Sequence, residues 1–244
     1  MASFINGSTT QEAKKTTSLL SQTFGWMTIG LLVTTLVSIG IAFLLNFLLQ
    51  NQATEVERIA LINNYYIVLG VAGIIQFILV MVIQFGVIRQ GPMNKNITVP
   101  FLLYVANMGV VLSFLVLVVE FDILASSLAI TLILFAMMYL FAKQTKWNLN
   151  GLAIVGSSLL IGGLILSLVN LFLGSSQLDW ILSFVLFGAI MLITLFDIWQ
   201  VNKVSQAGET NKNLALFFAF RLYVDFVYIF IRIVYFILLS RSRR

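Results

Sequence analysis

Four charged residues inside apolar stretches are the side chains best placed to do chemistry in this 244-residue chain. Asp197 falls in one stretch, and Arg221, Asp225 and Arg232 fall in the next one. At 100° per residue the last three share one narrow side of a helix. Because a charge at the centre of a bilayer costs at least about 2.5–3.5 kcal/mol, we expect that side to face other helices or water.

Asp197 and Asp225 are candidates for a proton-sharing pair. Asp197 lies near the end of its stretch with Thr194 and Gln200 on the same side, and Asp225 lies about three turns into the next helix. Two carboxylates in one site cannot comfortably hold two negative charges, so the pair binds and releases a proton as a unit. Two structural roles are the alternatives: Asp225 in an i,i+4 ion pair with Arg221, and Asp197 bonded to loop amides.

The chain contains no cysteine and no histidine, and this excludes several kinds of chemistry. Disulfides, thiolate nucleophiles and Ser-His-Asp catalysis cannot occur, and we expect no cofactor or metal site. Aspartyl intramembrane proteases also place two aspartates on facing helices, but they use a Gly-x-Gly-Asp motif. Here Asp197 follows Leu195-Phe196 and Asp225 follows Tyr223-Val224, so we expect no enzyme.

The elements that must position these residues are membrane helices. Hydrophobic residues make up 60% of the chain, charged residues only 9%, and the mean hydropathy is +1.04. Soluble domains carry about 25% charged residues, so a soluble enzyme is excluded. The aromatic content of 13% also excludes a disordered chain.

Seven apolar stretches are long enough to cross about 30 Å of hydrocarbon. The sequence therefore predicts an all-α integral membrane protein, a seven-transmembrane-helix bundle with a central C-terminal helix. A cytoplasmic N-terminal segment (1–23) would precede a single transmembrane domain (24–240) and a basic tail (241–244). Packing is the role that we expect for five glycines within these spans. The predicted spans are 24–49, 62–88, 97–118, 122–142, 150–174, 178–200 and 213–239, and the glycines are Gly70, Gly73, Gly156, Gly162 and Gly163.

The basic residues of the loops predict a cytoplasmic N-terminus. Eight basic residues fall on one side of the predicted topology, and Arg58 is the single basic residue in the alternate loops. The net charge of +5 follows from this topology, so no nucleic-acid partner is expected. The tail residues Arg241, Arg243 and Arg244 would lie outside after a full seventh crossing and inside if the last segment were re-entrant; its length favours a crossing. The eight residues are Lys14, Lys15, Arg89, Lys95, Lys143, Lys146, Lys203 and Lys212.

Several motifs, in order from about residue 20 to 240, resemble the Bax inhibitor-1 family, also called the transmembrane BAX inhibitor motif family. Leu222-Tyr223-Val224-Asp225-Phe226 with Phe230 resembles the signature of its last helix. Phe196-Asp197 and Gln200 resemble the aromatic-Asp-Thr-Gln element one helix earlier. Weaker similarities occur at the start of the first helix, Thr23 to Leu32, and in the link Thr145 to Gly151.

The resemblance implies a pH-sensitive calcium leak channel of a bacterial plasma (inner) membrane. In such channels two aspartates, which match Asp197 and Asp225, share a proton and keep the pore closed. An arginine that competes for the first aspartate matches Arg89, and Arg221 and Arg232 would be further charge partners. The sequence departs from the family pattern at Tyr228 and Asn148, where the family has Asn and Asp, and at the two flanking arginines. The alternative is a non-transporting membrane regulator of a partner protein, such as a membrane-bound protease or a stress or cell-death pathway.

Overall fold

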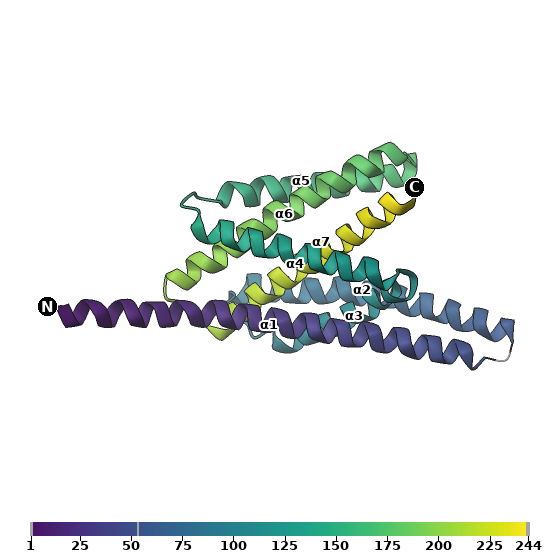
Figure 1. Ribbon diagram of the computed structural model, residues 1–244, viewed down its shortest axis with the longest axis horizontal. Coiled ribbons are helices and arrows are strands. Elements are labelled where there is room, and N and C mark those ends of the chain that lie inside the picture. The colour runs from purple at the N-terminus through teal and green to yellow at the C-terminus, as the bar shows by residue number, and fades with distance from the viewer. Residues whose placement is uncertain (1, 53, 243–244) are drawn as a thin grey trace. The chain divides into compact units, whose positions relative to one another are not determined.

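The computed structural model describes residues 2–52 and 54–242, and the side chains of 19–52 and 54–241. Over these residues the chain forms seven α-helices joined by short connections, with no β-strand (Figure 1). The predicted all-α architecture and the number of spans are confirmed. The helices are α1 (Ala2–Gln50), α2 (Glu55–Gln90), α3 (Thr98–Val118), α4 (Phe121–Gln144), α5 (Asn150–Leu173), α6 (Ser176–Gln206) and α7 (Lys212–Ser242).

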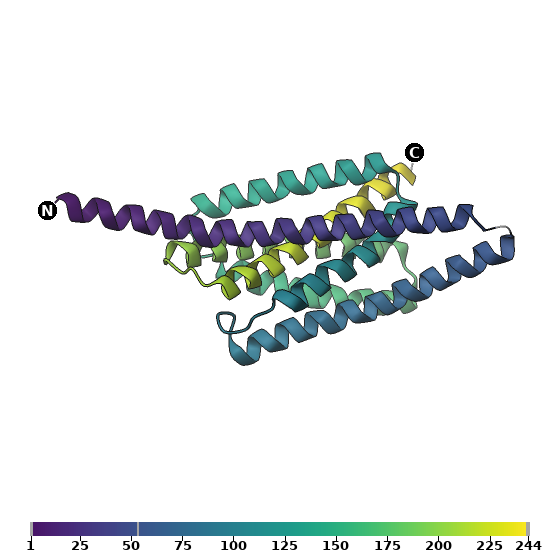
Figure 2. The ribbon, with the colours of Figure 1, turned by 90° about the horizontal axis from the view of Figure 1, so that it is seen from below.

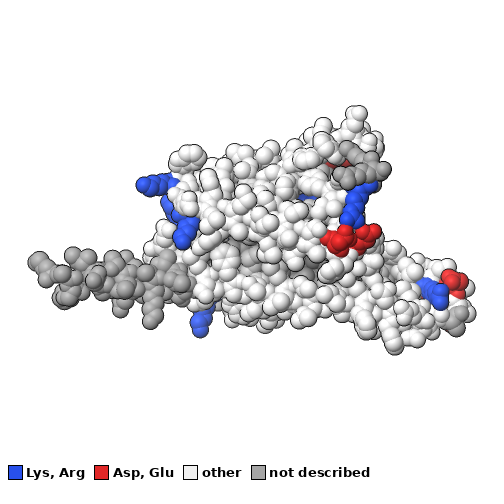
Figure 3. All heavy atoms as spheres, in the orientation of Figure 1, with Lys and Arg blue, Asp and Glu red and all other residues white. Residues whose placement is uncertain are grey.

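Each of these helices is long and apolar enough to cross a membrane, with a mean hydropathy of 2.1–2.7 in its most apolar window. Large apolar side chains are exposed along their lengths, including Phe43, Phe85 and Phe172. In the view of Figure 3 the charged side chains lie near helix ends, and the surface along the helices is almost free of charge. Such a surface suits contact with lipid, and the chain is an all-α, multi-pass membrane protein.

Three helices extend well beyond the predicted spans, and one of them is α2, which begins at Glu55 rather than near residue 62. Helix α1 begins at Ala2, so the polar segment predicted to precede the first span continues it as a helix. The Ser, Thr, Gln and Lys residues there are compatible with a helix, and the first proline is Pro92. Helix α6 continues to Gln206 rather than ending near residue 200.

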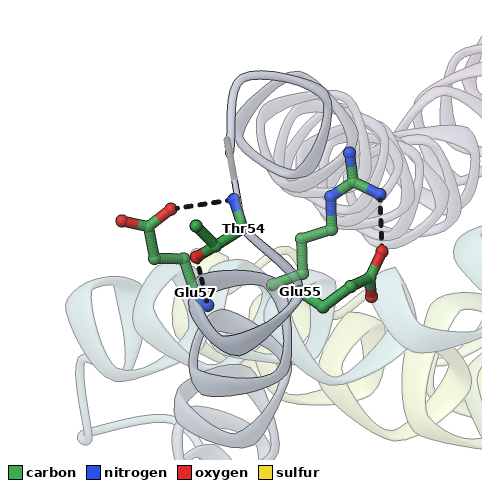
Figure 4. A network of polar contacts seen from close by, with 4 residues as sticks. Thr54, Glu55 and Glu57 are labelled. Carbon is green, nitrogen blue, oxygen red and sulfur yellow. Dashed lines mark hydrogen bonds and ion pairs between the residues drawn. The ribbon is translucent and has the colours of Figure 1, made fainter.

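Helix α2 begins with a reciprocal capping arrangement (Figure 4). The Glu57 amide donates to the Thr54 hydroxyl at 3.3 Å, and the Thr54 amide donates to the Glu57 carboxylate at 3.2 Å. Arg58 pairs with Glu55 one turn apart at 3.3 Å. The two hydrogen bonds between Thr54 and Glu57 give partners to amides that have none within the helix, and they fix the start of α2 at Glu55.

The chain divides into two compact units. The α1–α3 unit comprises Ser21–Phe121 and Asn211–Phe220, and the α4–α7 unit comprises Met1–Leu20, Asp122–Thr210 and Arg221–Arg244. All four intramembrane charged residues belong to the α4–α7 unit, namely Asp197, Arg221, Asp225 and Arg232.

In the α1–α3 unit, polar contacts and one glycine bring the helices together. A Cβ on Gly109 would lie 2.8 Å from the carbonyl oxygen of Thr34, so α3 approaches the backbone of α1 closely there. The Thr34 hydroxyl donates to the Val105 carbonyl at 2.8 Å. The Asn107 amide donates to Gln76 of α2 at 2.6 Å, and α2 and α3 lie side by side (Figure 2).

In the α4–α7 unit, α5 packs along α6 through two of the predicted glycines (Figure 1). A Cβ on Gly156 would lie 3.1 Å from the Ala189 carbonyl oxygen, and one on Gly163 would lie 2.7 Å from the Leu186 side chain. These two glycines have the predicted packing role. The prediction was wrong for the other three, since a Cβ there meets nothing within 4 Å: Gly70, Gly73 and Gly162.

Candidate functional site

The two predicted aspartates lie well inside their helices. Because α6 extends to Gln206, Asp197 lies nine residues, or about 13 Å, from its end. Asp225 lies thirteen residues, or about 20 Å, from the start of α7 at Lys212. The extension of α6 supplies the depth that the two carboxylates need in order to meet.

Asp197 and Asp225 are brought together in the α4–α7 unit. Asp197 is 2% exposed and Asp225 is 9% exposed. The two side chains lie near each other, and Asp225 also lies near Thr194 of α6. The Oδ2 atom of Asp225 is buried and has no hydrogen-bond partner among the described residues. The pair is thus removed from bulk solvent, and one of its oxygens is free to carry a proton.

Arg221 joins this cluster from α7. Its guanidinium forms an ion pair with the Asp197 carboxylate, and its Nη1 donates to Gln200 Oε1 at 2.9 Å. The long side chain therefore links α7 to α6, and the ion pair seen in the structure is not the i,i+4 pair with Asp225 that was one alternative. In that spacing the order of Arg before Asp is the weaker one.

The charge of the cluster depends on one proton. Two ionised carboxylates and one guanidinium leave a net charge of −1, whereas one shared proton makes the cluster neutral. Because an uncompensated buried charge is costly, the compact arrangement of Asp197, Asp225 and Arg221 fits the singly protonated, neutral state.

The other two predicted charge partners are placed elsewhere. Arg232 is half-buried, and its Nη1 donates to the Ser183 hydroxyl of α6 at 3.5 Å. Ser183 was not singled out from the sequence, although it lies fourteen residues before Asp197 on the same side of α6. Arg89 is exposed in the last turn of α2, in the α1–α3 unit, and its role toward Asp197 stays a prediction.

The length and the end of α7 bear on how the last helix crosses. It is one unbroken helix of 31 residues, about 46 Å long, and Arg241 at its end forms an ion pair with Asp122 at the start of α4. The helix is long enough to cross a membrane in full, and the full crossing stays a prediction. Of the tail, Arg243 and Arg244 lie outside the described residues.

The described part of the chain gathers no group of three or more acidic side chains that could hold a metal ion. The aspartate pair offers two carboxylates, of which one is already bound to a guanidinium. In this arrangement the ion pair of Asp197 with Arg221 is a contact between α6 and α7.

Comparison with known proteins identifies the family. The family model described as "Inhibitor of apoptosis-promoting Bax1" matches residues 16–243. The chain belongs to this family. The match confirms the resemblance to the Bax inhibitor-1 family and covers all seven spans, the aspartate pair included.

The family members that the chain resembles include several bacterial membrane proteins. It is 28% identical over 219 residues to the inner membrane protein YbhL of Escherichia coli K12, a match covering 87% of each chain. It is 29% identical over 196 residues to a membrane protein of Streptococcus pyogenes serotype M3, covering 79% of this chain and 83% of that one. A protein of Borreliella burgdorferi is 27% identical over 242 residues, covering 93% and 94%. No solved structure gives a significant match.

Proposed function

We propose that this member of the Bax inhibitor-1 family is a pH-sensitive, passive leak channel for Ca²⁺ in a bacterial inner membrane. The observation that carries the proposal is the buried pair Asp197 and Asp225, which joins α6 to α7 within the membrane. Intramembrane ionisable residues mark ion and proton pathways more often than not. The names of the bacterial relatives support the location, and the proposed channel carries out no catalytic step.

In the closed state the pair holds one proton. The proton, the two carboxylates and Arg221 then form a neutral cluster that ties α7 to α6. When the pH rises the proton leaves, the cluster acquires a net negative charge, and the two carboxylates repel each other. Separation of α6 and α7 admits water to the site, and the released carboxylates attract a divalent cation. Ca²⁺ flux should therefore increase with pH.

Ca²⁺ flux into proteoliposomes, measured across a range of pH, tests this mechanism. The wild type should conduct little at acid pH and more at alkaline pH. Asp197→Asn and Asp225→Asn each leave a single titratable carboxyl, so no proton is shared and the flux should lose its dependence on pH. Glu209→Gln removes one acidic charge from the connection between α6 and α7, outside the cluster, and should behave like the wild type.

The outcome also separates the two functions considered. If wild type and all variants give the same flux at every pH, gating by the pair is wrong. If none of the proteins conducts, the non-transporting regulator of a membrane protein partner is favoured. In that case the cluster of Asp197, Asp225 and Arg221 serves only to hold the helices together.

A further inference from the structure

Arg232 carries a permanent charge that the structure does not neutralise. It lies seven residues beyond Asp225 on α7, about 10 Å along the helix axis. Its contact is the neutral hydroxyl of Ser183 at 3.5 Å, and no carboxylate of the described residues lies within ion-pair distance of it. An arginine cannot lose its proton in a protein, so the charge must be solvated.

Water is the solvent that this position requires. Arg232 lies nine residues, or about 14 Å, before Arg241, within the span of α7. A guanidinium at that depth is stable only where water or a counter-ion reaches it. Its side chain is partly exposed rather than enclosed, so the packing of the described residues does not seal the guanidinium from solvent.

Three polar contacts along α6 and α7 define a single seam between these helices. Because the helices are antiparallel, the contacts follow in order: Arg221 with Asp197, Asp225 with Thr194, and Arg232 with Ser183. Between the second and third contacts the helices carry buried apolar side chains, namely Ile190 and Ile229. The α6–α7 seam thus has a proton-binding layer, an apolar layer and a positively charged layer. Apolar constrictions of this kind can gate a pore by excluding water.

We propose that Arg232 sets the charge selectivity of the leak, as a fixed positive charge on the ion route along the α6–α7 seam. The inference rests on the proposed function and adds the route and its barrier. A fixed charge raises the energy of a passing cation in proportion to the charge of that cation. Arg232 therefore opposes Ca²⁺ about twice as strongly, in free energy, as it opposes K⁺.

Neutralising Arg232 should change the two fluxes unequally. For Arg232→Gln we expect Ca²⁺ flux to rise about tenfold and K⁺ flux about threefold, since the barrier scales with ionic charge. Arg232→Lys keeps the charge and should leave the ratio of the two fluxes at its wild-type value. A change that merely loosened the helices would raise both fluxes by the same factor.

Restoring the charge chemically gives a second measurement. Because the natural chain has no cysteine, Arg232→Cys creates a single reactive thiol, and the wild type is the control for the reagents. A positively charged, water-soluble thiol reagent should return the Ca²⁺ flux of Arg232→Cys toward the wild-type value. A negatively charged reagent of similar size should keep it high or raise it further.

These results separate the inference from the proposed function. If the wild type conducts with the pH dependence set by Asp197 and Asp225, but Arg232→Gln leaves the ratio of Ca²⁺ to K⁺ flux unchanged, the inference alone is overturned. Equal effects of the two thiol reagents on Arg232→Cys would overturn it in the same way. If no protein carries Ca²⁺, the proposed function fails and the inference fails with it.

Discussion

Arg221 is the single side chain on which the stability of the buried cluster depends most. Its guanidinium is the positive charge that compensates the carboxylate of Asp197, which is 2% exposed. Desolvating two ions consumes much of their mutual attraction, so the intact pair adds little to stability. Removing one partner is different, because the remaining charge stays buried without compensation.

Replacing Arg221 with Gln should therefore destabilise the protein by about 3–5 kcal/mol. The measurement is thermal unfolding in detergent at a pH where Asp197 is ionised. The double variant Arg221→Gln with Asp197→Asn has no buried charge at this contact and should recover most of the loss. Lys212→Gln, an exposed change at the start of the same helix, is the matched control. If Arg221→Gln and Lys212→Gln unfold at the same temperature, the ion pair does not stabilise the protein in this way.

The sequence predicted the members of the cluster better than their pairing. Asp197, Asp225 and Arg221 stood out because each charge interrupts an apolar stretch, and periodicity placed Gln200 beside Asp197. The partner of Arg221 could not be predicted, since an arginine four residues before an aspartate reaches either its own helix or a neighbour. Ser183 was missed because a serine in a membrane helix usually bonds to its own backbone and so carries little signal.

At the scale of elements, α5 and α6 approach closely where a side chain is absent. A Cβ on Gly156 would lie 3.1 Å from the Ala189 carbonyl oxygen, and that backbone atom cannot easily move aside. Composition revealed the five candidate glycines but not which of them face a helix. Apolar residues occur on every side of α2 and α5. The spacing of the apolar residues therefore does not distinguish the packed side of each helix from the side toward lipid.

Two alanine substitutions on α5 test this contact. Gly156→Ala should push α5 away from α6 and destabilise the protein by about 1–3 kcal/mol. Gly162→Ala meets nothing within 4 Å and should be neutral, or stabilising by up to about 1 kcal/mol through helix propensity. Thermal unfolding of the two variants in the same detergent gives the comparison. Equal destabilisation by both would show that the contact with α6 is not the cause.

At the scale of the whole molecule, the apolar stretches were enough to predict seven crossings. Each span must satisfy its backbone hydrogen bonds internally, so a long apolar stretch has no alternative to a helix in lipid. The polar start of α1 was harder to predict, because no membrane constraint acts on residues outside the bilayer. The contact between Arg241 and Asp122 could not be predicted, because the two residues lie 119 residues apart in sequence.

The orientation of the seven crossings yields the final prediction. The loops and the N-terminal segment carry eight basic residues on one side of the topology, against Arg58 in the alternate loops and the three arginines of the tail, and this bias predicts a cytoplasmic N-terminus. A reporter enzyme that is active only outside the cytoplasm should therefore be inactive when fused within the connection between α6 and α7. The same reporter should be active when fused after Ser242, because α7 is long enough to cross fully. Equal activity at the two positions would mean that α7 does not cross. Opposite activities in the reverse sense would mean that the basic loops lie outside, and that the end of the α6–α7 seam carrying Arg232 faces the cytoplasm.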